Sequence, residues 1–283
     1  MKEHILSKYD IRKIFPYRNL DSHKGDNGRV CIIGGSIEYY GAPIFAGLGA
    51  VHSGADLVYI FVPESNFDCS RSFYPDFIVR SFAGEFLTED SLLKILELAN
   101  KCDVVLVGPG LSDKPDTIKA LRKFIPQIKT PVILDADALK VIHDIKLPYR
   151  TLLTPHHKEF EMISGYELTS SMEDNINAVQ KIASALKAQI ILKGQVDIIA
   201  KDNGEYKINK TGSPGMTVGG SGDVLAGFIA GIVAQGATLF EASCFATFCL
   251  GTAAEVLETQ KGYAFSATDL ALEIPYAMKK VVG

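Results

Sequence analysis

The clearest chemistry in this sequence lies in a cluster of small residues that ends in a carboxylate. Residues 219–227 read Gly-Gly-Ser-Gly-Asp-Val-Leu-Ala-Gly. The glycines let the backbone turn tightly and approach a ligand closely. The apolar run of residues 224–233 predicts a buried helix, so the turn lies at a helix N-terminus, where free N–H groups and the helix dipole favour an anion. The pattern predicts a phosphate-binding turn.

Asp223 is the unusual residue of this stretch, because its carboxylate would repel a phosphate unless it faced a substrate proton. Amides that hold a migrating phosphate, beside a carboxylate that accepts a hydroxyl proton, suit phosphoryl transfer. The alternative is that Asp223 only caps the helix. We favour the chemical interpretation, because several glycines and a base converge on one helix start.

Strands and helices alternate along the rest of the chain. Short apolar runs predict strands at residues 30–33, 56–62, 103–107, 132–134, 151–154 and 190–192, and a hairpin of residues 196–200 and 206–209. Helices are expected at residues 43–52, 89–100, 115–124, 172–186, 224–233, 240–258 and 267–279. This order predicts an α/β fold with a largely parallel central sheet, covered by helices on both faces in three layers.

Ligands in such folds bind at the carboxyl ends of the strands. Glycine, acidic and basic residues follow several expected strands: Gly34-Gly35, Gly108-Pro109-Gly110, Asp135, Pro155-His156 and Lys193-Gly194. We expect them to line one crevice. Simpler roles stay open, since Lys193 could be a solvated strand-end lysine and Asp135 could cap the next helix.

Composition excludes several classes of protein. The 283 residues carry a net charge of -4 and scattered basic residues, which argues against a nucleic-acid partner. Five cysteines without a C-x-x-C pair are typical of free thiols in a reducing compartment, so we expect a cytoplasmic protein. Residues 228–254 are apolar but interrupted by residues 235–238, which predicts two buried helices rather than a membrane span.

Familiar signatures of other enzyme classes do not occur. The sequence has no G-x-x-x-x-G-K-[ST] loop, no G-x-S-x-G elbow and no H-E-x-x-H pair. The phosphate-binding turn therefore does not belong to a P-loop enzyme.

The motifs together resemble a known family. Gly220-Ser221-Gly222-Asp223 resembles the Gly-x-Gly-Asp signature of the ribokinase-like superfamily. Further motifs occur in the order of its NAD(P)H-hydrate dehydratase family: His23-Lys24-Gly25, Gly41-Ala42-Pro43, Gly108-Pro109-Gly110-Leu111, residues 134–139, Thr154-Pro155-His156 and Leu192-Lys193-Gly194. The resemblance extends from about residue 22 to the end of the chain.

The resemblance implies a ribokinase-like three-layer α/β/α fold and one dehydratase domain over residues 1–283, with no room for an epimerase domain. It implies dehydration of the (6S)-hydrate of NADH or NADPH, driven by ADP or ATP with Mg²⁺. A homo-oligomer, with a tetramer as one form, and a separate epimerase acting alongside are further expectations.

The resemblance also assigns site residues by position. Asp223 is expected to be catalytic and to contact the substrate. The other expected substrate contacts are Ala42, Gly110 and His156. The expected nucleotide contacts are Lys193, Gly194, Gln195, Val196, Asp197, Gly220, Ser221 and Gly222. No metal ligands can be assigned.

The sequence departs from the family pattern at two places, one directly after His156 and one in the loop before the double glycine. His157-Lys158-Glu159 replaces Pro-Gly-Glu, and Val218 stands where many members carry lysine. The loop of residues 214–218 is similar to the archaeal form, which favours ADP as the donor.

Two other functions stay open at this level. One is a ribokinase-like kinase of a thiazole or a sugar, which would release a stable phosphate ester. The other is a nucleotide-binding sensor without catalysis. Nucleotide turnover separates them, because a sensor shows none, a kinase accumulates a phosphorylated product, and a dehydratase releases phosphate and regenerates reduced cofactor.

Overall fold

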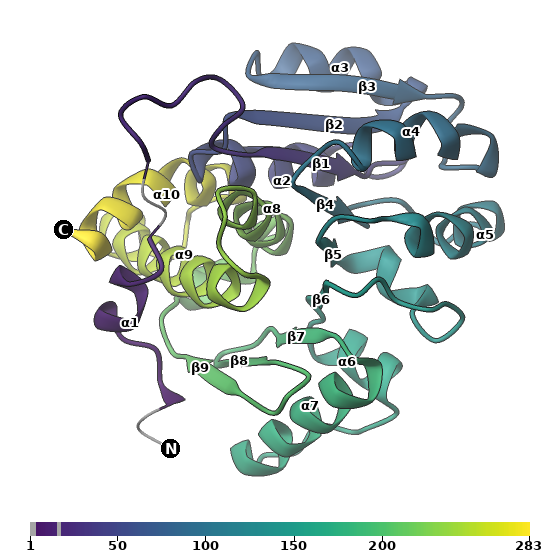
Figure 1. Ribbon diagram of the computed structural model, residues 1–283. Coiled ribbons are helices and arrows are strands. Elements are labelled where there is room, and N and C mark those ends of the chain that lie inside the picture. Colours follow the sequence, from purple (N-terminus) through teal and green to yellow (C-terminus); the bar gives the residue numbers. More distant parts are fainter. Residues whose placement is uncertain (1–3, 16–17) are drawn as a thin grey trace.

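A nine-stranded sheet forms the centre of the computed structural model, which describes residues 4–15 and 18–283 (Figure 1). The strand order is β3-β2-β1-β4-β5-β6-β7-β8-β9. The strands are β1 (Arg29–Ile33), β2 (Leu57–Pro63), β3 (Phe77–Phe82), β4 (Val104–Val107), β5 (Val132–Leu134), β6 (Thr151–Leu153), β7 (Gln189–Leu192), β8 (Asp197–Ala200) and β9 (Tyr206–Asn209). Pairing is parallel from β3 to β7 and antiparallel at β8 and β9.

Helices cover both faces of the sheet (Figure 1). Their bounds are α1 (Lys8–Arg12), α2 (Gly41–His52), α3 (Phe67–Phe73), α4 (Leu92–Ala99), α5 (Pro115–Phe124), α6 (His157–Ser164), α7 (Met172–Leu186), α8 (Ser221–Ala234), α9 (Leu239–Lys261) and α10 (Ala267–Val282). One buried cluster joins the sheet to α2, α8, α9 and α10, and a second joins it to α4, α5, α6 and α7. The expected three-layer α/β/α arrangement is confirmed.

The sequence of strand β1 is apolar throughout because both faces of the sheet are buried at this strand. Val30 and Ile32 lie in the cluster with α8, while Cys31 and Ile33 lie in the opposite cluster. Successive side chains of a strand point to opposite faces, and both faces are covered here. The strand therefore reads as a continuous apolar run.

Helices α8 and α9 are the two buried helices expected from residues 228–254. Helix α9 is long and apolar enough to cross a membrane by length and composition alone. However, 83% of its apolar window is buried inside the protein. Its apolar surface is therefore explained by packing in the core.

Helices α2 and α8 cross with their backbones in contact. A Cβ atom at Gly49 would collide with the carbonyl oxygen of Val224, and one at Gly227 would collide with the carbonyl oxygen of Ala46. Only glycine permits this approach. The crossing fixes the start of α2 relative to the start of α8, and both starts face the site described below.

Several details differ from the sequence-based expectations. The helix expected at residues 89–100 begins as a 3-10 turn, Glu89–Ser91, and α4 starts only at Leu92. The sequence pattern did not indicate β3 or α3. Strand β3 pairs only with β2 at the sheet edge, so it includes the exposed Arg80 and the half-exposed Ser81, and its apolar pattern is broken.

Candidate active site

The carboxyl ends of five neighbouring strands, β1, β4, β5, β6 and β7, meet at one edge of the sheet. The N–H of Gly35 donates to the carbonyl oxygen of Pro109 at 2.8 Å, which joins the ends of β1 and β4. The N–H of Lys193 donates to the carbonyl oxygen of Pro155 at 2.9 Å, which joins β6 to β7. The strand-end residues that the sequence singles out therefore do lie along one edge.

The glycine turn that the sequence predicts as a phosphate site begins helix α8. Gly220 is the N-cap residue and has φ 96°, a left-handed conformation that favours glycine. The ring of Phe45 on α2 lies 2.6 Å from where a Cβ of Gly220 would stand. Both the backbone angle and this neighbour therefore require glycine at the turn.

The amides at the start of α8 are free to bind an anion. Within the described residues, the N–H groups of Gly222 and Asp223 find no acceptor. The Ser221 side chain points back into the preceding loop, where its hydroxyl donates to the carbonyl oxygen of Met216 at 2.7 Å. The turn therefore offers a phosphate its backbone amides, while the Ser221 hydroxyl holds the loop.

Asp223 does not cap helix α8. It is the third residue of α8, and the helix has no side-chain cap bond. Burial, together with the negative charge of Asp135, raises the pKa of Asp223 to about 8. The positive charge of Lys193 only partly offsets these effects. A carboxyl group with such a pKa is suited to exchange a proton near neutral pH.

Lys193 lies between β5 and α8. Its ammonium nitrogen donates to Oδ1 of Asp135 at 2.9 Å, and it lies 3.4 Å from where a Cβ of Gly222 would stand. Burial disfavours the charged ammonium, but the carboxylates of Asp135 and Glu159 outweigh it and raise the pKa of Lys193. The Lys193 ammonium is therefore fixed by Asp135 beside the start of α8. The alternative of a solvated strand-end lysine is wrong.

Asp135 is the partner that holds this cation. The residue is 2% exposed, and its Oδ1 also accepts a hydrogen bond from the Thr154 hydroxyl at 2.7 Å. It stands at the start of a 3-10 helix but makes no side-chain cap bond there. The alternative role of Asp135 as a simple helix cap is therefore wrong.

The loop after β7 holds the remaining expected nucleotide contacts. Gly194 and Gln195 are exposed, while Val196 packs partly into the core. Asp197 accepts hydrogen bonds from the Gly194 N–H at 3.1 Å and from Asn209 Nδ2 at 3.0 Å. Its carboxylate therefore closes the loop, and β8 begins one residue later than the expected 196.

Ala42 and Gly110, two of the expected substrate contacts, lie against each other. A Cβ at Gly110 would stand 3.0 Å from that of Ala42, and Gly110 has φ 69°. His156 lies at the other end of the edge as the N-cap of α6, where its Nδ1 accepts from the Glu159 N–H at 3.3 Å. Its half-exposed ring faces outward at the rim.

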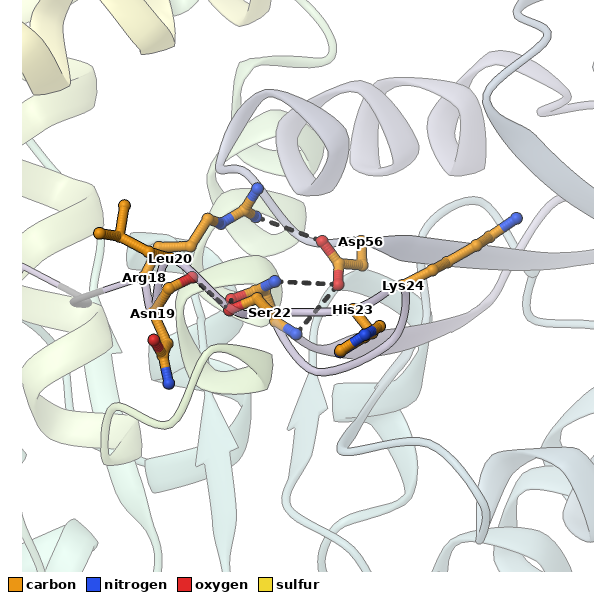
Figure 2. Close-up of a pocket in the computed structure, with 8 residues that line it drawn as sticks. Arg18, Asn19, Leu20, Ser22, His23, Lys24 and Asp56 are labelled. Atoms are coloured by element: carbon orange, nitrogen blue, oxygen red, sulfur yellow. Dashed lines mark hydrogen bonds and ion pairs between the residues drawn. The ribbon is translucent and has the colours of Figure 1, made fainter.

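The motif His23-Lys24-Gly25 lies at the opposite edge of the sheet, before β1. His23 and Lys24 of this motif line a cavity of about 430 Å³ together with Arg18, Asn27 and Asp56. Figure 2 shows Arg18 directed at Asp56, while Lys24 points away from it. Asn27 Nδ2 also donates to the Asp56 carboxylate, at 3.1 Å. The loop is folded around that carboxylate, so this motif stabilises the fold and does not belong to the strand-end site.

No ready-made metal site accompanies these residues. Among the described residues, no group of three or more His, Cys, Asp or Glu side chains is arranged to hold a metal ion. Asp135, Glu159 and Asp223 nonetheless all act on Lys193 electrostatically, so carboxylates outnumber the cation here. A divalent cation brought in with nucleotide phosphates fits this surplus of negative charge.

The sheet, the glycine turn and its aspartate define a ribokinase-like α/β/α protein. A ribokinase-like superfamily protein from Enterococcus faecalis is similar over 98% of this chain and 96% of its own, with a TM-score of 0.87 and 27% identity. The family model described as NAD(P)H-hydrate dehydratase matches residues 30–276. The chain belongs to this NAD(P)H-hydrate dehydratase family, which confirms the resemblance seen in the sequence.

Individual relatives support the assignment. An ADP-dependent (S)-NAD(P)H-hydrate dehydratase from Cenarchaeum symbiosum is 35% identical over 99% of this chain and 98% of its own length. A crystal structure of the ADP/ATP-dependent NAD(P)H-hydrate dehydratase from Bacillus subtilis, co-crystallised with ATP/Mg²⁺, has a TM-score of 0.85 and 26% identity, with 98% of both chains covered.

A longer relative matches only in part. The bifunctional NAD(P)H-hydrate repair enzyme Nnr of Methanothermobacter thermautotrophicus is 41% identical over 95% of this chain. The match covers 53% of that protein, so this chain spans about half the length of such bifunctional relatives.

Sequence reasoning did not assign roles to three residues of the site. Thr154 and Glu159 stand within or beside quoted motifs, and Phe45 is an ordinary apolar residue of α2. The position of Thr154 after a strand was a usable signal. Nothing local in the sequence marks Phe45, because its contact with Gly220 joins segments far apart in the chain.

Proposed function

We propose that this protein repairs nicotinamide cofactors by dehydrating the (6S)-hydrate of NADH or NADPH, coupled to hydrolysis of ADP or ATP. The observation that carries the proposal is the buried carboxylate of Asp223 in the first turn of α8, within electrostatic reach of the Lys193 ammonium, which itself lies beside Gly222 of the same turn. Family membership over residues 30–276 supports the substrate class.

The proposed chemistry has two steps. Asp223 accepts the proton of the C6 hydroxyl, whose oxygen attacks the terminal phosphorus of the nucleotide. The bond between that phosphorus and its bridging oxygen breaks, leaving a phosphate ester on the ring and a nucleotide shorter by one phosphate. The C6–O bond then breaks, phosphate leaves, and loss of a proton from the neighbouring ring carbon restores the double bond. Phosphate is a far better leaving group than hydroxide, which explains the need for a donor.

Each site residue has a place in this scheme. The amides of Gly222 and Asp223 and the ammonium of Lys193 stabilise the charge on the migrating phosphate. Gly194, Gln195 and Val196 form the exposed loop for the nucleotide, which Asp197 shapes, and Gly220 and Ser221 shape the turn. Ala42, Gly110 and His156 line the part of the site that receives the hydrated nicotinamide ring.

Mg²⁺ is part of the proposal and would neutralise the nucleotide phosphates. Magnesium sites commonly use one or two carboxylates together with substrate phosphates. The ion would therefore enter with the nucleotide, beside the carboxylates around Lys193, rather than occupy a protein cage of its own.

The setting of the enzyme follows the same proposal. Residues 1–283 form one dehydratase domain, in a homo-oligomer that works in the cytoplasm without nucleic-acid or membrane partners. A separate epimerase supplies the S epimer from the epimer of opposite configuration at C6.

Recovery of the absorbance of NADH from its purified S-hydrate tests the function. We expect recovery only when nucleotide and Mg²⁺ are both present, with loss on chelation by EDTA. Recovery at full rate without nucleotide would contradict the coupling. Accumulation of a stable phosphate ester would favour the kinase alternative, and the absence of any nucleotide turnover would favour the sensor.

A further inference from the structure

Asp135 connects the ends of three strands through one oxygen atom. Its Oδ1 accepts from Lys193 Nζ at 2.9 Å and from Thr154 Oγ1 at 2.7 Å. Asp135 follows β5, Thr154 follows β6 and Lys193 follows β7. The carboxylate is almost fully buried, and a buried ion pair is in general a poor way to stabilise a fold. Its geometry therefore points to a role beyond stability.

The backbone around Asp135 is held in an unusual conformation. A Cβ at Gly108 would collide with the carbonyl oxygen of Asp135, so β4 approaches it as closely as glycine allows. The next residue, Ala136, has φ 49°, which is strained for a residue with a side chain. This turn directs Asp137 away, to accept the Ser112 N–H at 2.8 Å. Of these two aspartates, Asp135 is the one that accepts a hydrogen bond from Lys193.

The ion pair ends at the anion-binding turn. Lys193 Nζ lies beside Gly222, whose N–H is one of the free amides of α8. A lysine has four rotatable side-chain bonds, so without a fixed partner its ammonium would sample many positions. Pairing with a buried carboxylate leaves it essentially one position, next to the amides.

We infer that Asp135 is a positioning residue that fixes the Lys193 ammonium at the phosphate-binding turn and sets the charge around Asp223. This inference rests on the proposed function and adds to it a residue that acts through another. Asp135 does not contact the phosphate itself. It determines where the cation stands when the nucleotide arrives.

Replacement of Asp135 should shift the pH dependence of kcat/KM in one direction. The charged groups that act on Asp223 are Asp135 and Asp137 after β5, Glu159 on α6 and Lys193 after β7. Asp135→Asn removes a neighbouring negative charge and frees Lys193 to approach Asp223. Both changes favour the ionised form of Asp223, so the rising limb of kcat/KM against pH should move to lower pH.

A double-mutant cycle on ADP binding provides the main test. Calorimetry with ADP and Mg²⁺ would compare the natural protein, Asp135→Asn, Lys193→Met and the double variant. We expect each single change to weaken ADP binding by about tenfold or more, the usual effect of losing a charge-assisted hydrogen bond. The double variant should bind no more weakly than Lys193→Met. Losses that add would overturn the inference, because Asp135 would then act independently of Lys193.

Matched variants separate positioning from simple damage. Asp137→Asn removes an equal charge two residues away and should leave ADP affinity within about twofold. Thr154→Val removes the other hydrogen bond to Asp135 Oδ1 but keeps the negative charge of Asp135. The rising limb of kcat/KM against pH should therefore stay at the same pH. If Thr154→Val shifted the limb as Asp135→Asn does, the charge assignment would be wrong.

Asp135→Glu carries the test if the neutral variant does not fold. It keeps the negative charge but moves it by one methylene, so it should weaken ADP binding while the pH limb stays near its natural position. Unchanged ADP affinity in a folded Asp135→Glu protein would overturn the inference. Because the binding cycle needs no hydrated cofactor, a natural protein that binds ADP without dehydrating the hydrate would contradict the proposed function alone.

Discussion

Gly220 occupies the N-cap of α8, three residues before Asp223, and makes no side-chain capping bond. No side chain caps this helix end, so Asp223 does not act as its cap, although an acidic residue in the first turn is common because it interacts favourably with the helix dipole. Its carboxylate is buried within electrostatic reach of Asp135 and Lys193. Three of the predictions below depend on this relationship.

Replacing Asp223 with asparagine should abolish most of the activity while leaving the site intact. The change keeps the size of the side chain but removes the base, so turnover should fall by roughly 10²–10⁴. Nucleotide affinity should hold or rise, since a carboxylate near a phosphate repels it. Measurement of kcat together with the ADP Kd tests both parts. Near-normal turnover would show that Asp223 is not the base.

The same variant should be more stable than the natural protein, increasingly so as pH rises. The pKa of Asp223 is about 8 in the fold against an ordinary value of 3.8, so the folded state keeps a proton that the unfolded chain releases. The natural protein therefore loses stability as pH rises from about 4 to about 8, and Asp223→Asn does not. Thermal unfolding at several pH values should show a Tm difference that widens over this interval. A difference that does not change with pH would contradict the raised pKa.

The pH dependence of turnover follows from the same group. If Asp223 must be ionised to act as the base, kcat/KM of the free enzyme should rise through a pKa near 8. The measurement is kcat/KM for the hydrate from pH 6 to pH 9 at fixed ionic strength, with ADP and Mg²⁺ saturating. A flat profile over this range would show that the proton is accepted elsewhere.

ADP should serve as a better donor than ATP. The basis is the loop of residues 214–218 and the presence of Val218 in place of a lysine, which removes one cation from the phosphate region. Comparison of kcat/KM for the two nucleotides tests the preference. A clear preference for ATP would show that the loop does not set the donor, without affecting the reaction class.

Asp56 should contribute to stability through the loop that it holds. Its carboxylate accepts the N–H groups of Gly25 and Asn27 at 2.9 and 3.0 Å and pairs with Arg18. Burial alone would raise the pKa of Asp56, but these hydrogen bonds outweigh it and lower the pKa. Asp56→Asn should reduce the free energy of unfolding by about 1–3 kcal/mol near neutral pH.

The pH dependence of that loss has the opposite sign to that of Asp223. Stabilisation by a carboxylate with a lowered pKa is present above its ordinary value and disappears as pH falls through the folded-state pKa. The Tm difference between Asp56→Asn and the natural protein should therefore close in acid. Asp26→Asn, in the same exposed loop, is the control and should cost little. An equal loss from both variants would contradict a special role for Asp56.

The general fold was predictable because its strands are buried on both faces. Such strands appear as unbroken apolar runs, and β1, β4 and β5 were found within a residue of their bounds. Strand β3 was missed because an edge strand is covered less completely and tolerates Arg80 and Ser81. Helix α6 was also missed, because its capping box uses His156, an unusual cap residue.

The candidate site was predictable only in part, for a related reason. Asp223 could be found because its glycines and helix are continuous in sequence. The role of Asp135 depends on Lys193, 58 residues later, so no local pattern reveals it. The motif indicated Ser221 as a nucleotide contact but not the direction of its hydroxyl, which donates to the carbonyl oxygen of Met216 five residues earlier.

The crossing of α2 and α8 has a consequence for substrate size. Ala42 lies in the first turn of α2 and Asp223 in the first turn of α8, and the two helices touch through main-chain atoms at Gly49 and Gly227. The distance between the two helix starts is therefore set by main-chain contacts. At Gly49 and Gly227 there is no side chain that could be shortened to bring the helices closer together. Substitutions at those glycines can only push the two helices apart. A site for a smaller substrate ring would therefore have to arise through changes elsewhere.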